Sequence, residues 1–462
     1  MKERKREGFS SSLGAFFATL GSAVGLGNIW KFPYLIGSNG GAAFLIVYLL
    51  CVIIVGVPIM IAEFYIGRRT RKNIVGAVED LSGKKGWGTI GVLGVTSSYL
   101  VMFFYSAVGG WVYSYVVKSV MGRFKSITKE SASEIFAATQ RGIFSPIAWQ
   151  IVVIAVVCLV ILFGVQKGIE GLTKKLMPIL FILIIICAAR AITLPGSAEG
   201  LKFLFKPNFS LITPQVILAA LGLSFFKLSV GLGTMATYGS YFTDDNNMIK
   251  TSFRVAISDT MVSILAGIAI FPAVFSFGMK AEAGPGLLFE TIPLVFSQIP
   301  FGRVLLIAFF VLTSIAATTA MISMMEVPIT YFIEEKNMSR KRAVLINGAI
   351  VALVGVLAAL SSSEKGILGN VLVFGKSFFN LFDYLSSNLL MPIGGLLIAI
   401  FVGYFNSKKD IEKELSNKGS LNNKVIISLF VFIIKYITPI LVFIISLQSI
   451  GILDWLINNI VK

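Results

Sequence analysis

Two glycine-rich stretches interrupt apolar parts of the sequence, and both could bind charged groups through the backbone. Residues 21–28 (GSAVGLGN) hold three glycines and residues 229–234 (SVGLGT) hold two. Glycine is less favourable than alanine in a helix by about 1 kcal/mol, so these stretches mark places where a helix could unwind. Unwinding frees N–H groups, which suit a carboxylate, and carbonyls, which suit an ammonium group or a sodium ion. The alternative use of such glycines is close packing between helices.

Two charged residues, Lys227 and Asp259, also lie within apolar stretches. A lone charge at the centre of a lipid bilayer costs several kcal/mol, so a lysine and an aspartate at that depth should be paired or functional. These two residues are therefore candidates for an internal ion pair.

The sequence offers no histidine-based catalytic or metal chemistry. The chain has no histidine, which excludes histidine metal sites, Ser-His-Asp triads and histidine proton relays. Cys51, Cys158 and Cys187 all lie in apolar runs, where they indicate packed thiols rather than a disulfide framework or a zinc site. No nucleophile and base converge, so we expect no enzyme and no organic cofactor.

The elements that must position these residues are membrane spans. Of 462 residues, 56% are apolar and only 14% are charged, against about a quarter charged in a typical soluble domain. Apolar runs of the roughly 20 residues that cross a bilayer recur along the whole chain. The sequence predicts an all-α polytopic membrane protein with eleven spans, at residues 13–36, 43–66, 89–118, 147–163, 172–192, 213–241, 251–277, 303–333, 342–360, 376–405 and 425–448.

The net charge of +17 follows from membrane topology rather than from nucleic-acid binding. With the N-terminus in the cytoplasm, 24 Lys and Arg residues lie in or beside the cytoplasmic segments and 13 in or beside the outer ones. The positive-inside rule therefore predicts a cytoplasmic N-terminus, and eleven spans then place the C-terminus outside.

The two glycine-rich stretches fall in the first and sixth spans, five spans apart. That arrangement is expected of a five-plus-five inverted repeat whose broken helices 1 and 6 form the binding site. We therefore treat residues 1–462 as one transporter domain, with repeats at 13–192 and 213–405 and a separate helix at 425–448. Residues 281–300 are too short and too interrupted to span, and predict an external helical hairpin or lid. The tail after residue 448 predicts a short interfacial helix around Trp455.

The first of these stretches, GSAVGLGNIWKFPY at residues 21–34, resembles the first-helix signature of the neurotransmitter:sodium symporter family, the LeuT-like transporters. Further matches, in family order, cover almost all of residues 5–448. They are Pro58 to Arg68 with Glu63, KGIE at 167–170 with Met177 and Pro178, SFFKLSVGLG at 224–233, ATYGSY at 236–241, SRKRAVL at 339–345 and KYITP at 435–439. Within the family the chain resembles most the bacterial sodium-dependent tyrosine transporters, which also have eleven spans.

The resemblance implies a substrate site between helices 1 and 6. The amides of Leu26 and Gly27 and the hydroxyl of Tyr105 would bind the substrate carboxylate. The amine would meet the carbonyls of Ala23, Phe226 and Lys227 and the hydroxyl of Ser229. The lining of the side-chain pocket would be Ser22, Ala23, Val101, Phe226, Ser229, Leu232, Ala320 and Met324.

The size of the predicted pocket favours a large, flat side chain. Leu232 and Ala320 are smaller than the phenylalanine and serine of LeuT at these positions, and Met324 is flexible. This favours aromatic amino acids, and size alone does not separate Tyr, Trp and Phe.

The resemblance also implies sodium sites. One would use the carbonyls of Gly21, Val24 and Ala316 with the hydroxyl of Thr319, while Ala320 replaces a usual second hydroxyl. The other, around Ala23, Asn28 and Asp259, has Lys227 where the family has Thr or Ser.

Two interpretations of this second sodium site remain open. Either the Lys227 ammonium takes the place of that sodium with Asp259 as its counter-ion, or Lys227 snorkels away and Asp259 binds sodium. In both, the fixed negative charge of Asp259, with Ser263 nearby, implies transport that does not depend on chloride.

The remaining site residues would be gates. Lys31 and Asp383 would form the outer pair, and Arg6 and Glu334 the inner pair, with Tyr241 nearby.

The resemblance as a whole implies a sodium-coupled symporter in the bacterial inner membrane that imports aromatic amino acids by alternating access. L-tyrosine is the leading substrate, and sodium, the amino acid and the lipid bilayer are the expected partners, with no nucleic acid and no obligate protein partner. An importer of branched-chain or other neutral amino acids is the alternative, and a sensor or channel on the same fold is an alternative of another class.

Overall fold

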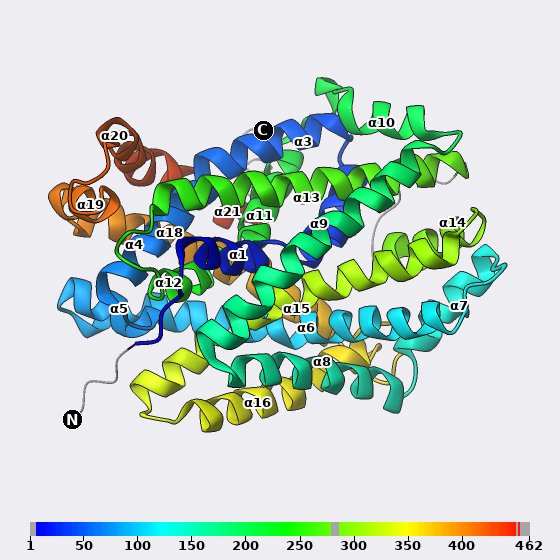
Figure 1. The fold of residues 1–462 in the computed structure, drawn as a ribbon, viewed down its shortest axis with the longest axis horizontal. Helices are drawn as coiled ribbons and strands as arrows, with labels where there is room; N and C mark the ends of the chain where they lie inside the picture. Colours follow the sequence, from blue (N-terminus) through cyan, green and yellow to red (C-terminus); the bar gives the residue numbers. More distant parts are fainter. Residues whose placement is uncertain (1–5, 279–285, 450, 453–462) are drawn as a thin grey trace.

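The computed structural model describes residues 6–278, 286–449 and 451–452, and these residues are almost entirely helical (Figure 1). Nine helices in the described part of the chain are long and apolar enough to cross a membrane. They are α3, η2 and α4 (Ala42–Thr70), η3 and α6 (Lys85–Val120), α8 (Phe144–Leu162), η4 and α9 (Val165–Ile192), α13 (Met248–Ser276), α15 (Gly302–Glu335), α16 (Arg340–Ser361), α17, η7 and α18 (Phe378–Phe405) and α20, η8 and α21 (Lys424–Gln448).

The sequence predicts eleven spans, of which the first and the sixth are broken. Besides the nine helices, one bent pair, Ser12–Ala23 with Gly27–Ser38, brings the possible spans to ten within the described residues. The expected sixth span is divided into α11 (Pro214–Lys227) and α12 (Thr234–Gly239), each too short to cross a bilayer alone. The predicted break explains why the sixth span is not one membrane-length helix, since unwound residues add no helical length.

The first break separates α1 (Ser12–Ala23) from the π-helical turn η1 (Gly27–Lys31) and from α2 (Phe32–Ser38), and the chain bends there by 49°. The N-terminus of α1 is capped by the hydroxyl of Ser11, which accepts a hydrogen bond from the Gly14 N–H. The helix ends where residues 21–28 predict unwinding.

The second break lies between Lys227 and Thr234 and depends on glycine. Gly231 and Gly233 have φ angles of +79° and +75°, in the left-handed region that glycine enters readily. A Cβ on Gly231 would also lie 2.3 Å from the carbonyl oxygen of Met391, so no larger residue fits. These glycines therefore permit both the conformation of the break and its close contact with α18.

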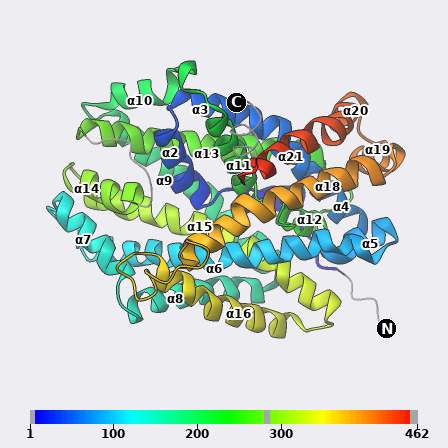
Figure 2. The same cartoon turned by 180° about the vertical axis from the view of Figure 1, so that it is seen from behind.

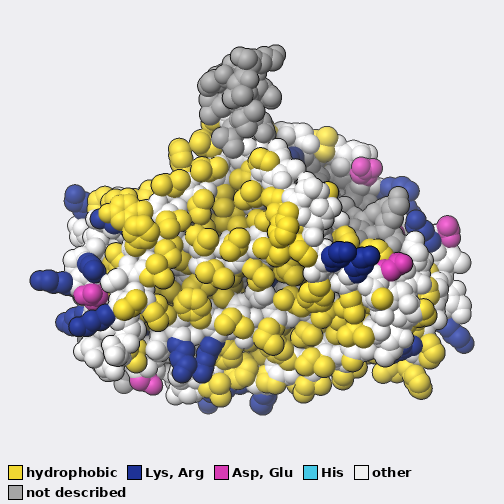
Figure 3. All heavy atoms as spheres, turned by 90° about the horizontal axis from the view of Figure 1, so that it is seen from above, with side chains coloured by type: hydrophobic (Ala, Val, Ile, Leu, Met, Phe, Trp, Pro, Cys, Tyr) yellow, Lys and Arg dark blue, Asp and Glu magenta, His cyan; other side chains and the backbone are white. Residues whose placement is uncertain are grey.

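The broken helices lie among the long ones (Figures 1 and 2). Helix α1 contacts α9, α12, α13 and α15, while α12 contacts α4, and α6 packs along α15. The side of the molecule shown in Figure 3 is mostly hydrophobic, and its Lys and Arg side chains gather mainly towards the two ends. That distribution is expected of a helical bundle whose apolar side faces lipid.

Short helices connect the long ones. They are α5 (Ile74–Ser82), α7 (Lys129–Gln140), α10 (Ser197–Phe205), η5 (Phe209–Leu211), η6 (Leu287–Thr291), α14 (Ile292–Ser297) and α19 (Lys408–Leu415). Of the hairpin or lid predicted at residues 281–300, η6 and α14 form a continuous helical stretch, and residues 281–285 lie outside the described part. The predicted helix around Trp455 also lies outside it.

Candidate functional site

A small cavity of about 20 Å³ lies between the two breaks. Eleven of the twelve residues predicted to bind substrate line it, together with Gly25. Those eleven are Ser22, Ala23, Gly27, Val101, Tyr105, Phe226, Lys227, Ser229, Leu232, Ala320 and Met324.

The twelfth residue, Leu26, is fully buried beside the cavity, and its backbone N–H donates to the Tyr105 hydroxyl at 2.7 Å. The neighbouring Gly25 N–H donates to the Asn28 side-chain oxygen at 3.0 Å. Both amides thus bond to side chains instead of to carbonyls one turn back, so the helix cannot continue. The structure places Tyr105 of α6 at the first break, within reach of a ligand held there.

One hydroxyl joins the two breaks. The Ser229 Oγ donates to the Ser22 carbonyl at 3.0 Å, although the Ser229 backbone has a φ of +51°. The Ser22 hydroxyl lines the cavity and, among the described residues, is buried without a hydrogen-bond partner. A buried hydroxyl of this kind is available to a ligand, because polar groups are rarely left unpaired.

The second break is held by a residue to which our sequence analysis assigned no role. The buried carboxylate of Glu63 in α4 accepts hydrogen bonds from the N–H groups of Gly231, Met235 and Ala236, at 2.7, 3.1 and 3.2 Å. It therefore binds the unwound stretch and the first turn of α12. The sequence did contain a signal for this role, namely a single glutamate in an apolar span, because a carboxylate at that depth needs hydrogen-bond partners.

The residues of the first predicted sodium site lie between α1 and α15. A Cβ on Gly21 would lie 3.3 Å from the Thr319 Cβ, so the two residues are neighbours. The Gly21 carbonyl does not accept a hydrogen bond from the Gly25 N–H, because that N–H donates to the Asn28 side-chain oxygen. The Thr319 hydroxyl donates its proton to the Ile315 and Ala316 carbonyls, at 3.0 and 3.2 Å, which leaves its lone pairs free. These oxygen donors fit a sodium ion transported as a co-substrate.

Lys227 and Asp259 form an ion pair inside the bundle. The Lys227 Nζ lies 3.0 Å from an Asp259 carboxylate oxygen, and the side-chain exposure of both is 0%. The interpretation in which Lys227 snorkels away is therefore wrong. The physical reason is that the ammonium finds a carboxylate and two hydroxyls within reach.

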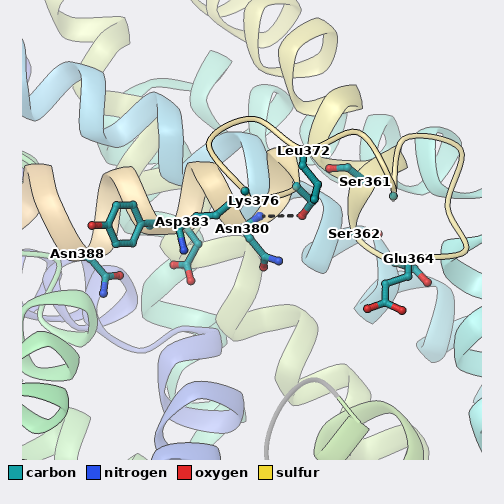
Figure 4. A pocket seen from close by; sticks show the side chains of 13 residues that line it. Ser361, Ser362, Glu364, Leu372, Lys376, Asn380, Asp383 and Asn388 are labelled. Carbon is teal, nitrogen blue, oxygen red and sulfur yellow. Dashed lines mark hydrogen bonds between the residues drawn. The ribbon is translucent and has the colours of Figure 1, made fainter. Parts of the chain in front are cut away.

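At one end of the cavity, Lys31 and Asp383 form the expected pair at 3.0 Å. The Lys31 ammonium also lies 4.1 Å from the ring centre of Phe226, which lines the cavity. Beyond the pair is a wider pocket, where Asn380, Asp383 and Asn388 point to one side of their helical stretch (Figure 4). The ion pair and the Phe226 ring thus lie between the cavity and this pocket.

At the other end, Arg6 and Glu334 form the expected ion pair, and the Arg6 guanidinium carbon lies 4.9 Å from the centre of the Tyr241 ring. Sequence reasoning missed a second pair there. The fully buried Glu326 accepts from Arg340 at 2.9 Å and from the Tyr241 hydroxyl at 2.7 Å. An ion pair therefore lies at each end of the cavity.

The fold and the site match known transporters. The model of the "Sodium:neurotransmitter symporter family" matches residues 6–134 and 137–456. The chain is 39% identical to the uncharacterized sodium-dependent transporter YhdH of Bacillus subtilis over 98% of this chain and all of that one. It is 35% identical to an uncharacterized sodium-dependent transporter of Haemophilus influenzae, covering 96% and 98%. The crystal structure of MhsT in complex with L-phenylalanine superposes with a TM-score of 0.90 at 39% identity, covering 96% of this chain and all of that one.

The chain therefore belongs to the sodium:neurotransmitter symporter family. It is a multi-pass membrane protein with the LeuT-like fold, and it is a sodium-dependent symporter rather than an enzyme. The family and the fold that the first-helix signature predicts are confirmed.

Proposed function

We propose that this protein imports aromatic amino acids together with sodium by alternating access, with L-tyrosine as the leading substrate and L-phenylalanine and L-tryptophan close to it. The observation that carries the proposal is the cavity between the two breaks. Ser22, Ala23, Gly25 and Gly27 of the first break line it, together with apolar side chains. A zwitterionic amino acid with an apolar side chain matches both the backbone of the break and the apolar side chains.

The substrate class is supported by the lining and by one relative. Val101, Leu232, Ala320 and Met324 give the cavity an apolar wall without charge. The related structure of MhsT, at 39% identity, contains L-phenylalanine. The Ser22 hydroxyl, which is unpaired among the described residues, gives the cavity a polar atom that a substrate can satisfy.

We assign the Arg6–Glu334 end to the cytoplasm and the Lys31–Asp383 end to the outside of a bacterial inner membrane. Six basic residues line the pocket at the first end, namely Arg6, Arg71, Lys72, Lys84, Lys85 and Arg340. Lys376 is the basic residue among those that line the pocket at the other end. Basic residues favour the cytoplasmic side, which supports this orientation.

Uptake into proteoliposomes tests the function. We expect accumulation of labelled L-tyrosine against its gradient when sodium is present outside, and none when sodium is replaced by potassium. Replacing chloride by gluconate should change nothing. An excess of each unlabelled amino acid, added in turn, ranks the substrates.

Three results would contradict parts of the proposal. Competition by leucine and valine but not by aromatic amino acids would favour the branched-chain importer. Equilibration without accumulation would indicate a channel. Sodium-dependent binding without any uptake would indicate a sensor.

A further inference from the structure

The ammonium group of Lys227 is bonded on all sides inside the bundle. Its nitrogen lies 3.0 Å from an Asp259 carboxylate oxygen and 2.8 Å from the Tyr48 hydroxyl, and it also donates to the Ser263 hydroxyl. The rings of Phe32 and Tyr48 lie 4.7 and 4.6 Å from it, in positions that attract a cation. These partners use the three N–H bonds that an ammonium has.

The oxygens of the Asp259 carboxylate also have hydrogen-bond partners. One Asp259 oxygen accepts from the Asn28 amide at 2.6 Å, and the other faces Lys227 and the Tyr48 hydroxyl. The Asn28 amide also donates to the Ser263 hydroxyl at 3.0 Å, while its oxygen accepts from the Gly25 N–H. The charged and polar groups here therefore partner one another.

The chemistry of these partners is that of a cation site. A carboxylate and two hydroxyls are the kinds of oxygen ligand that hard cations prefer, and the Asn28 amide holds two of these groups through its NH₂ group. They come from η1, α3 and α13, and Lys227 reaches them from the last residue of α11, where the helix dipole also favours positive charge. The cation in this site is part of the chain.

We propose that the Lys227 ammonium is a built-in cation that occupies this site permanently, so that the protein couples transport to one sodium ion. A sodium ion added a few ångströms away would be repelled by the ammonium, and a single carboxylate cannot offset both. The remaining sodium would bind where α1 meets α15, at Gly21, Val24, Ala316 and Thr319. This inference rests on the proposed sodium-coupled function.

The same lysine contributes to the substrate site. Lys227 lines the cavity, and its Cγ would lie 3.2 Å from a Cβ built on Gly27 in the first break. Because Lys227 and Asp259 together carry no net charge, the substrate carboxylate must be held by N–H groups of the break rather than by a sodium at this position.

Sodium counting on the purified, detergent-solubilised protein tests the inference. Radioactive sodium at saturation should give one ion bound per wild-type chain. Substrate binding titrated with sodium should give a Hill coefficient near one. Lys227→Thr removes the ammonium, adds a hydroxyl oxygen and leaves the oxygens of Asp259, Tyr48 and Ser263, so both values should rise towards two. Added sodium should also raise the melting temperature of this variant more than that of the wild type.

Lys227→Met is the matched control, because it removes the charge but offers no oxygen ligand. It leaves the same oxygens of Asp259, Tyr48 and Ser263 but adds no hydroxyl, so it should bind the second sodium more weakly than Lys227→Thr does. Two sodium ions bound per wild-type chain would overturn the inference and leave the transporter function intact. Wild-type protein that binds substrate without any sodium dependence would instead overturn the proposed function. The number of sodium ions bound per wild-type chain tests the inference even if a variant fails to fold.

Discussion

At the scale of single residues, a few side chains define the proposed substrate site. Tyr105 reaches the first break from α6 and accepts the Leu26 N–H at 2.7 Å, and Leu232 forms part of the cavity wall. We expect separate effects from the two residues, because Tyr105 acts on the carboxylate of a substrate and Leu232 on its side chain.

Tyr105→Phe should weaken substrate binding by about 1.5–3 kcal/mol, the range for a hydrogen bond to a charged group. The change removes the hydroxyl that we assign to the substrate carboxylate, and equilibrium binding of labelled tyrosine measures it. Tyr115→Phe is the control. Tyr115 is also buried in α6, and its hydroxyl donates to the Phe289 carbonyl away from the cavity. Equal affinity in Tyr105→Phe and wild type would disprove the assignment.

Leu232→Phe should shift the preference of the site from aromatic to smaller aliphatic amino acids. A phenylalanine ring at this position overpacks the small cavity, and overpacking typically costs about 1–3 kcal/mol. Competition assays measure the ratio of tyrosine to leucine affinity. A ratio that does not change would mean that Leu232 does not contact the substrate side chain.

At the scale of elements, each break is stabilised by a side chain from a neighbouring helix. Tyr105 of α6 does so for the first break, and Glu63 of α4 does so for the second. The unwound backbone therefore depends on tertiary contacts, because an N–H group left unpaired in a membrane interior is costly.

Glu63→Gln should lower the stability of the folded protein by about 1–3 kcal/mol. The change replaces one carboxylate oxygen, which accepts a hydrogen bond from a backbone N–H group, with an NH₂ group that cannot accept one. Thermal unfolding in detergent measures the loss, and substrate binding should weaken with it. The control is Glu134→Gln, since Glu134 is exposed on α7. A melting temperature equal to that of the wild type would show that Glu63 does not hold the break.

At the scale of the whole molecule, the cavity lies between two ion pairs that are both formed. Lys31–Asp383 lies at one end and Arg6–Glu334 at the other. Alternating access requires that one pair opens while the other stays closed, so removing one pair should favour the state open on that side.

Arg6→Ala should abolish concentrative uptake while substrate binding survives. The loss frees Glu334 and the Ser240 hydroxyl from Arg6 and lets the end that we assign to the cytoplasm open more often, so substrate leaks back. Proteoliposome uptake compared with binding to the same preparation separates the two effects. Lys413→Ala, on the exposed part of α19, is the control for loss of a basic charge. Full accumulation by Arg6→Ala would show that this pair does not close the cytoplasmic end.

Much of the fold was predictable because membrane burial imposes long apolar runs, and glycine pairs within them stand out. The family followed from residues 21–34, where a specific order of small, aromatic and charged residues meets the first break. The breaks at Ala23 and Lys227 occur where the glycine stretches indicate them, since glycine propensity is local information.

Contacts between distant parts of the chain needed the tertiary structure. The sequence showed that Lys227 and Asp259 require partners, and the packing of α3, α11 and α13 with η1 decided that they pair with each other and with Tyr48 and Ser263. The roles of Glu63 and Glu326 likewise depend on which helices are neighbours. Side-chain type thus determined which groups were too polar to stay alone in a membrane, and three-dimensional packing decided which partner each one found.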